Sequence, residues 1–394
     1  MVAFAGLRGT GDWGVDERPK NFREMILWRN PNGSAPLTAL MARMKTEKTD
    51  DPEFAWWEEE LNAVRVVVDG AQTSGDTAIE LVAGGLSLVI GDILLVSKTE
   101  VAGYDNEIIE VTAVTDDTNI VAARGAAGST AAAITDLDLL TKIGNVYAEG
   151  TNSPTVSADN PVKQLNFAQI FKTAYELTGT AQVTRARTGD PLKNDKKRRM
   201  FSHSVSLELA FLFGKAFETT GSNGKPKRFC GGLREFITTN ATVYTGAVTE
   251  DTFLDDIYRV FDYDAGNAGN ERIVFAGNVF LNELNKIARL SPSTRVNFDG
   301  TVKAYGMELQ KWVLPQGTLF VRTHPLLNTH AVYEASAFII DPSAIIYRPL
   351  RDTKPMDNIQ ANDADTRKGQ WMTEAGIEVR HEKTMAYLGN FSAT

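Results

Sequence analysis

The spacing of apolar residues predicts a long helix in the middle of the chain, over residues 190–221. Asp190 can cap the free backbone N–H groups, Pro191 suits the first helical position, and Gly221 supplies a stop. Between them, apolar residues recur three or four positions apart, as on one buried face: Phe201, Val205, Leu209, Leu212, Phe213 and Phe217. At about 1.5 Å per residue, this helix would be roughly 45 Å long.

Ahead of this helix, the pattern is that of short β-strands. Between Val64 and Ile143, runs of β-branched and aliphatic residues are separated by turn residues such as Gly91 and Gly125. This pattern is typical of a small all-β domain. We therefore predict a barrel or sandwich, inserted as a unit over residues 65–143.

The segments on either side of this insertion, residues 50–64 and 144–183, are predicted to form the two limbs of an extended β arm. Alternation of apolar and polar side chains over 162–183 predicts a long strand with one polar face. Trp56 and Trp57 stand beside three consecutive glutamates. That combination fits either an interface or a short capped helix buried in its own subunit.

After the long helix, helical and strand-like patterns alternate. Helical spacing covers residues 249–261 and 278–290. The strand-like runs cover 272–276, 307–313, 318–321 and 332–340. This mixture predicts one α+β domain over residues 226–344. Further strand-like runs in residues 345–394 are expected to return to an earlier domain.

Residues 1–49 differ from the rest, because Pro, Gly and Asn recur and only residues 35–44 have a helical pattern, with Ser34 as cap. Such a segment has few apolar side chains with which to fold alone. We expect either an arm that lies against something else or a partly disordered tail.

Charge is distributed unevenly along the chain. The net charge is −9, and between Arg65 and Lys142 four basic residues against twelve acidic ones give −8. This segment and the remainder are therefore expected to face different surroundings. The first half of the long helix is, in contrast, basic, and it could face a polyanion or the acids of a neighbouring subunit. Its basic residues are Lys193, Lys196, Lys197, Arg198 and Arg199.

The sequence contains no recognisable catalytic or metal-binding motif. One cysteine, Cys230, and four histidines leave little for a zinc site and exclude an intrachain disulfide. The loop 125–128 lacks the Lys-Ser/Thr of a phosphate-binding loop. A membrane-spanning run of eighteen apolar residues is also missing. We therefore predict no enzymatic activity, no cofactor and no metal, and favour binding or assembly.

The order of these parts, together with several short stretches, resembles the major capsid (head) proteins of tailed phages. The stretches are APLTALMARM (35–44), DPEFAWWEEEL (51–61), KIGNVYAEG (142–150), NFAQIFKTAYELTGTAQ (166–182), ELAFLFGK (208–215), YRPLRDT (347–353), NIQANDAD (358–365) and TEAGIEVR (373–380). The resemblance is to a subfamily that carries a β-rich insertion, and it spans most of the chain.

This resemblance implies the Hong Kong 97-type fold, an α+β architecture. Residues 1–49 would be the N-terminal arm, and residues 50–64 and 144–183 the extended loop around the inserted domain 65–143. The peripheral domain would comprise 184–225 and 345–394, with the spine helix 190–221. The axial domain would then be residues 226–344.

The same resemblance implies a protein that assembles with itself into hexameric and pentameric capsomers of an icosahedral head around double-stranded DNA. The DNA would be bound without sequence preference, and portal and scaffolding or decoration proteins are expected partners, with no membrane. The protein would belong to the virion and assemble in the host bacterial cytoplasm. Because the arm is short, we expect a separate scaffolding protein or none.

Large aromatic residues in the arm and extended loop are expected to contact neighbouring subunits, because little local chain is available to bury them. They are Phe22, Trp28, Trp56, Trp57 and Phe171. Two alternatives stay open: an encapsulin-like protein compartment, which shares the fold, and a binding protein or enzyme that works through residues 65–143. The single aromatic residue of that insertion, Tyr104, argues against a sugar-stacking platform.

Overall fold

The computed structural model describes residues 45–59, 64–97, 106–154, 160–184, 188–263, 270–290, 298–304 and 307–392. The chain divides into two compact units. The smaller is Trp57–Lys163, and the larger joins Met1–Trp56 to Gln164–Thr394. The predicted arm up to residue 44, including its short helix, Phe22 and Trp28, lies outside the described residues.

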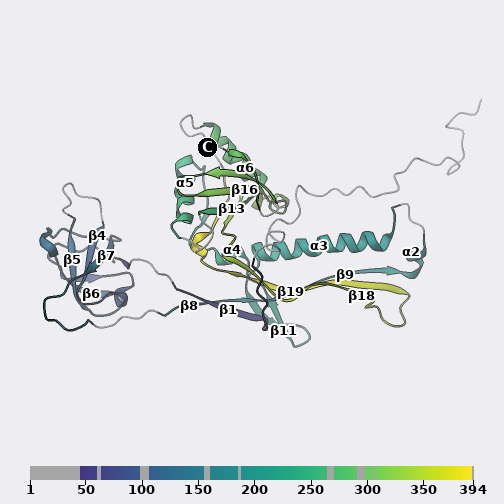
Figure 1. Cartoon of the computed structure of the whole chain (residues 1–394), viewed down its shortest axis with the longest axis horizontal. Helices are drawn as coiled ribbons and strands as arrows, with labels where there is room; N and C mark the ends of the chain where they lie inside the picture. The colour runs from purple at the N-terminus through teal and green to yellow at the C-terminus, as the bar shows by residue number, and fades with distance from the viewer. Residues whose placement is uncertain are drawn as a thin grey trace, which may run out of the picture. The chain divides into compact units, whose positions relative to one another are not determined.

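The smaller unit contains a six-stranded sheet, drawn in blue in Figure 1, in which all described pairs are antiparallel. In sheet order, the strands are β2 (Arg65–Val67), β7 (Leu139–Asn145), β4 (Asp92–Ser97), β5 (Ile108–Val114), β6 (Asn119–Ala123) and β3 (Ala78–Glu80). Two short 3₁₀ helices, η1 (Gly85–Ser87) and η2 (Ala126–Gly128), lie in the loops. β7 extends past residue 143, the predicted end of the inserted domain, to Asn145.

Hydrogen bonds between the two ends of this sheet close it into a barrel. Val68 forms an antiparallel bridge with Leu81, and the Val82 amide donates to the Val67 carbonyl at 2.9 Å. Closure of this kind removes a free sheet edge. The barrel interior is filled by buried aliphatic side chains that alternate along each strand: Val66, Val68, Ile79, Leu81, Leu88, Leu94, Val96, Ile109, Val111, Ile120, Ala122, Ile134 and Leu140.

In the larger unit, the predicted long helix is α3 (Pro191–Phe213), and it is shorter than the sequence indicated. Its start is as expected, because the Asp190 carboxylate accepts from the backbone N–H of Leu192 at 2.9 Å. It ends at Gly214 rather than Gly221. A Cβ atom at Gly214 would lie 2.2 Å from the Cys230 carbonyl oxygen, so the chain must turn there without a side chain. At 23 residues, α3 is about 35 Å long.

The buried face of α3 also differs from the predicted stripe. Phe201 and Leu209 are 43% and 39% exposed, and Phe217 lies beyond the helix end. Of the predicted stripe, Leu212 is buried and Phe213 partly so, and the other buried residues of α3 are His203, Leu207, Glu208 and Phe211. His203 and Glu208 are polar, and their partners Thr373 and His324 come from distant segments of the chain, so the spacing of apolar residues predicted the buried face correctly only at its C-terminal end.

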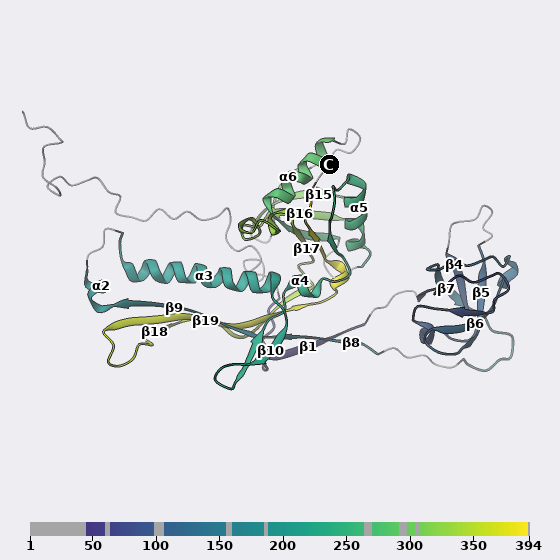
Figure 2. The ribbon, with the colours of Figure 1, turned by 180° about the vertical axis from the view of Figure 1, so that it is seen from behind.

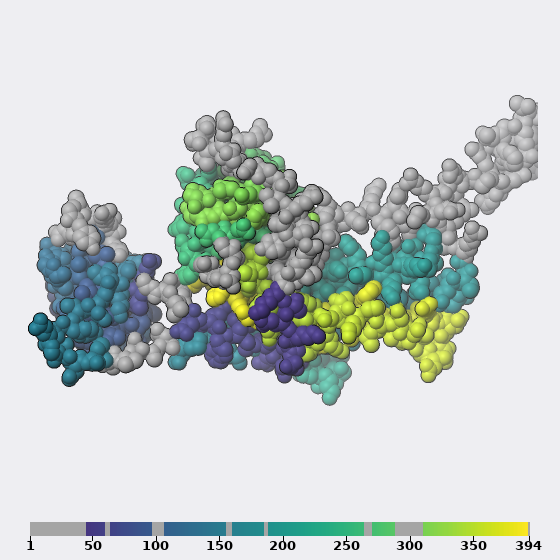
Figure 3. Space-filling view, in the orientation of Figure 1, coloured from purple at the N-terminus to yellow at the C-terminus, as the bar shows by residue number. Residues whose placement is uncertain are grey.

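Helix α3 lies along a three-stranded antiparallel sheet, as Figures 1 and 2 show. In order, the strands are β18 (Ile345–Asp357), β19 (Thr366–Val379) and β9 (Gln169–Thr178). Figure 3 shows the same layer from outside, with the yellow-green strands directly below the teal helix. The C-terminal segment thus returns to pair with a strand that precedes α3.

The predicted long strand over 162–183 is wrong, because three elements occupy that segment. They are β8 (Val162–Phe167), β9 and the short helix α2 (Gly179–Val183). The two strands separate at Ala168, whose amide donates to the Pro52 carbonyl at 2.7 Å. The Thr178 side chain caps α2. β8 pairs with β1 (Glu53–Glu58), so the tryptophan-containing segment is a strand and not a helix.

The remaining part of the larger unit is a seven-stranded mixed sheet. In order, its strands are β12 (Ala241–Val243), β20 (Ala386–Gly389), β17 (Ala337–Ile340), β13 (Glu271–Ala276), β16 (Thr318–Thr323), β15 (Met307–Val313) and β14 (Phe298–Ala304). Strands β13 and β16 run parallel, whereas β17 is antiparallel to β13. The α+β class predicted from the sequence is confirmed.

Two predicted boundaries in this region are wrong. Residues 333–335 form the 3₁₀ helix η5 (Tyr333–Ala335), so the strand predicted over 332–340 begins only at Ala337. β20 belongs to the seven-stranded sheet, so residues 345–394 do not all lie with α3, as the peripheral domain assignment required. The reason is the order of strands in the sheet. β20 lies between β12 and β17, and a local sequence pattern does not reveal which strands will be neighbours.

Both faces of the seven-stranded sheet are buried. Ile273 and Phe275 of β13 face the core that also contains Phe211 of α3. The alternate residues, Val274 and Ala276, face a second core. Helices α5 (Glu250–Tyr258) and α6 (Asn278–Leu290) supply residues to that second core. Burial on both faces explains the nearly continuous apolar runs of β13 and β17. Other short helices are α4 (Leu233–Phe236), η3 (Arg259–Phe261), η4 (Leu327–Thr329) and η6 (Glu382–Thr384).

Candidate functional site

Lys196, one of the five basic residues predicted to face a partner, is instead bound within its own chain. Its Nζ lies 3.0 Å from Asp357 Oδ2 and 5.7 Å from the ring centre of Trp371. The Trp371 indole N–H donates to the Lys196 carbonyl at 3.2 Å, and the Tyr175 hydroxyl donates to Asp357. The hydrogen bond to Asp357 raises the pKa of Lys196. Lys196 therefore anchors α3 to all three strands beneath it.

The other four residues of the group are exposed at the beginning of α3, and we call them the basic head: Lys193, Lys197, Arg198 and Arg199. Lys193 Nζ lies 3.9 Å from its own capping residue, Asp190, and Arg198 lies 3.7 Å from Asp195. Ion pairs this exposed contribute little to stability. All four side chains of the basic head therefore lie at the surface.

The predicted intersubunit aromatic contacts are wrong for Trp56 and Phe171. Trp56 is 6% exposed and packs on Phe236 with ring centres 5.6 Å apart. Phe171 is 7% exposed and meets Phe211 of α3 edge to face. Alternation along β1 turns Phe54 and Trp56 inward and leaves Trp57 64% exposed. Among the described members of this group, only Trp57 offers a large apolar surface to a partner.

A contact that sequence reasoning missed fixes the described end of the N-terminal segment to β18. Thr46 forms a parallel bridge with Tyr347, and the Glu47 amide donates to the Tyr347 carbonyl at 3.0 Å. The Glu47 carboxylate accepts from Arg348 at 2.7 Å, across 301 residues of sequence. Its pKa is lowered by its hydrogen bond to Lys45 and by Arg348. No local pattern signals a pairing at such a separation.

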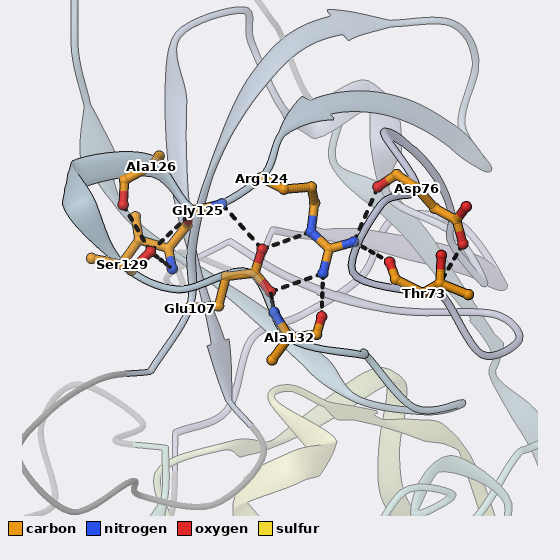
Figure 4. A network of polar contacts seen from close by, with 9 residues as sticks. Thr73, Asp76, Glu107, Arg124, Gly125, Ala126, Ser129 and Ala132 are labelled. Atoms are coloured by element: carbon orange, nitrogen blue, oxygen red, sulfur yellow. Dashed lines mark hydrogen bonds and ion pairs between the residues drawn. The ribbon is translucent and has the colours of Figure 1, made fainter.

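A second missed feature is a buried ion pair at one end of the barrel (Figure 4). Arg124 donates from Nε and Nη2 to the two carboxylate oxygens of Glu107, at 2.6 and 2.8 Å. Arg124 Nη1 also donates to the backbone carbonyls of Thr73 and Asp76. The Ala132 amide donates to Glu107 at 3.0 Å. Three loops are thereby fastened to one pair of side chains.

The Glu107 carboxylate stays ionised although it is only 2% exposed. Burial alone would raise its pKa, but the hydrogen bonds from Arg124 and from the Ala132 amide outweigh burial and lower it. Charged and fully bonded, the pair stabilises the loop arrangement and offers no free acid or base. We find no sign of catalysis in this network.

The rest of the described chain offers no reactive centre. Cys230 is fully buried, and burial raises the pKa of its thiol to about 12, so it is a poor nucleophile. Within the described residues, no three or more His, Cys, Asp or Glu side chains gather where they could hold a metal ion. None of the helices described there is long and apolar enough to cross a membrane.

Comparison with known proteins gives one strong match and several weak likenesses. The SU10 major capsid protein family matches residues 6–392. A major capsid protein of Pseudomonas phage PaMx41 is 27% identical over 353 residues, 88% of this chain and 82% of that protein. The capsid of Myoviridae phage XM1 is 7% identical, covering 94% of this chain and 96% of that chain, with a TM-score of 0.45.

An encapsulin is also among the weak structural likenesses. The holo-SrpI encapsulin complex from Synechococcus elongatus PCC 7942 is 11% identical, covering 60% of this chain and 78% of that chain, with a TM-score of 0.40. Both structural likenesses are too weak to bear on function. The family match, in contrast, spans both units and nearly every described element. This chain therefore belongs to the SU10 major capsid protein family and is a structural protein of a phage capsid.

Proposed function

We propose that this capsid protein assembles with itself into hexameric and pentameric capsomers of an icosahedral head that encloses double-stranded DNA. The match of the capsid family to residues 6–392 carries the proposal. The order of elements supports it: an extended β1–β8 pair, a long helix on a three-stranded sheet, and a separate mixed sheet. In the Hong Kong 97-type arrangement these would be the extended loop, the peripheral domain and the axial domain.

We further assign the barrel unit to the outer surface of the head. The barrel segment from Arg65 to Lys142 carries eight of the nine excess negative charges of the chain. Such charge would be unfavourable beside densely packed phosphates and harmless on the outside. A barrel that lines the interior, seen as internal density in an image of the assembled head, would contradict this assignment.

The basic head at the beginning of α3 is proposed to face the interior, where it would meet phosphates without reading sequence. These contacts would be weak singly and screened by salt. Replacing Lys193 and Lys197 by glutamine should leave shells intact and reduce the DNA that they retain. The Lys196→Gln variant is the matched control, because Lys196 is occupied by Asp357. Failure of the double variant to form shells would instead place the basic head at a subunit contact.

The purified full chain, viewed by negative-stain electron microscopy, tests the main proposal. Closed shells of capsid size are expected. Small shells filled with cargo protein would favour the encapsulin-like alternative, and discrete oligomers would favour a binding protein built around the barrel. Portal, scaffolding or decoration proteins would complete the head, and assembly would take place in the cytoplasm of the bacterial host.

A further inference from the structure

The hairpin formed by β10 (Phe217–Thr220) and β11 (Pro226–Phe229) has no partner strand among the described residues. Every residue of β10 is exposed, and Figures 2 and 3 show the hairpin projecting away from α3 and its sheet. An isolated two-stranded hairpin is only marginally stable in water. Its order therefore calls for a surface that covers it.

The exposed surface of this hairpin is aromatic and basic. Phe217 is 59% exposed and lies beside Phe229, with ring centres 6.5 Å apart. Lys227 Nζ lies 5.0 Å above the Phe229 ring, and Lys225 is exposed in the adjoining turn. Arg228 is partly neutralised by Glu218 at 2.6 Å. A complementary surface must therefore supply apolar side chains flanked by carboxylates.

One corner of the barrel unit offers that combination, and we call it the Leu86 corner: Val82, Leu86, Asp116 and Asp117. Leu86 is 64% exposed and Val82 53%. The Leu86 amide donates to the Asp117 carboxylate at 3.4 Å, and the Gly85 amide donates to the Asp117 carbonyl at 2.8 Å. These bonds place the exposed side chain of Leu86 beside the exposed Asp117, and Val82 and Asp116 are exposed in the same two loops.

The Leu86 corner is rigid before any partner binds. A Cβ atom at Gly85 would lie 2.6 Å from the Asp116 carbonyl oxygen and 2.9 Å from that of Asp117, so the Gly85 loop and the β5–β6 turn are packed together closely. Hydrogen bonds from Asn119 and Thr118 hold the Asp116 carboxylate in place and lower its pKa. A surface that is already ordered loses less conformational entropy when it binds.

We propose that the β10–β11 hairpin of one copy of this chain docks onto the Leu86 corner of a second copy. Phe217 would pack against Leu86 and Val82, and Lys225 and Lys227 would face Asp116 and Asp117. A polyanion would satisfy the lysines but would leave Phe217 and Leu86 uncovered, so a second copy is the better occupant. The inference rests on the proposed self-assembly and adds the pair of surfaces that meet.

Two chains with one substitution each provide the test: Leu86→Cys in one and Phe217→Cys in the other, mixed before assembly and then mildly oxidised. The native Cys230 is buried, with a thiol pKa of about 12, and will not interfere. Shells of the mixture should give a disulfide-linked dimer on a non-reducing gel. Each chain assembled alone should give none. A link between the two different chains can arise only between copies.

Leu137→Cys in place of Leu86→Cys is the matched control, because Leu137 is 68% exposed on another barrel turn flanked by Asp136 and Asp138. A dimer of equal or greater yield with this control, or no dimer in well-formed mixed shells, would overturn the inference. If the unmodified chain forms no shells, the proposed function fails first and the inference falls with it.

Charge reversal gives a second readout in case a cysteine variant does not assemble. Lys225→Glu with Lys227→Glu should abolish shell formation or the dimer, whereas the charge-conserving Lys225→Arg with Lys227→Arg should retain both. If the Lys225→Glu with Lys227→Glu variant assembles normally but its shells retain less DNA, the hairpin binds a polyanion. That result would overturn docking on a second copy.

Discussion

Buried polar contacts occur both in the barrel and in the α3 layer, which is α3 with strands β9, β18 and β19, but they join residues at very different separations in the sequence. In the barrel, Glu107 and Arg124 are 17 residues apart. In the α3 layer, His203 contacts Thr373 and Tyr175 contacts Asp357, across 170 and 182 residues. A substitution of a buried polar residue in the barrel should therefore destabilise the barrel alone. A substitution beneath α3 should destabilise the helix together with the distant strands that it contacts.

The two regions also differ in whether their hydrophobic core continues into another sheet. The described barrel core is built only from residues between Val66 and Leu140. The core beneath α3 continues into one face of the seven-stranded sheet through Phe275 and Phe338. The α3 layer and that sheet should therefore unfold together, and the barrel should unfold on its own. The variants below test this difference, in order of decreasing effect.

Phe211→Ala should have the largest effect. Phe211 is 1% exposed and its ring meets both Phe171 and Tyr347, so truncation leaves a cavity between α3 and its sheet. The expected loss is about 4 kcal/mol of unfolding free energy, measured by urea denaturation of the full chain. The matched control is Phe201→Ala on the exposed side of α3, which should change little. Equal losses in both variants would contradict the observed helix face.

Arg124→Ala should be nearly as costly but confined to the barrel. It leaves the Glu107 carboxylate buried without its cation and releases the loop carbonyls that Arg124 binds, at an expected cost of about 3 kcal/mol. Hydrogen exchange followed by mass spectrometry should show faster exchange within residues 65–145 and unchanged protection in α3. The exposed Arg65→Ala is the control. Loss of protection in α3 would contradict the independence of the barrel.

This comparison also explains what could be predicted from the sequence. The barrel strands, the start of α3 and the α5 and α6 helices follow from local patterns, because alternation, capping and helical spacing are read within a few residues. The buried face of α3 does not, because His203 and Glu208 are buried only where Thr373 and His324 arrive to bond them. The burial of Trp56 and Phe171 could not be predicted either, because they pack against Phe236 and Phe211, which are distant in the sequence.

Lys196→Gln should have a moderate effect on the α3 layer. The variant loses the ion pair with Asp357 and the cation–π contact with Trp371. Because the lysine side chain is a third exposed, solvent screens part of the stabilisation that these two contacts provide. About 1 kcal/mol of unfolding free energy is expected from the lost charged hydrogen bond. Lys193→Gln, next to the start of the same helix, should cost nothing measurable. An equal loss of stability in both variants would mean that the positive charge of the helix start is responsible, and not the contact of Lys196 with Asp357.

The last expected effect is a pH dependence of the α3 layer. His203 is 1% exposed, its Nε2 lies 2.8 Å from Thr373 Oγ1 and its Nδ1 lies 3.1 Å from Thr173 Oγ1. Burial lowers the pKa of His203 below its ordinary value of 6.5. The unfolded chain therefore binds a proton first as pH falls, and the layer should lose stability from pH 6.5 downward, by at most about 1.4 kcal/mol per pH unit.

Asp357 and Glu47 do not obscure that range. The pKa values of Asp357 and Glu47 are lowered in the folded chain from ordinary values of 3.8 and 4.5, so the stability that they contribute is lost only at more acidic pH. Urea denaturation at pH 7.5 and pH 5.5, followed by hydrogen exchange of α3, measures the effect. The uncharged His203→Gln variant should show a flat response over the same range. A slope that survives in this variant would mean that another group titrates, and that the contact of His203 with Thr173 and Thr373 does not set the acid sensitivity of the layer.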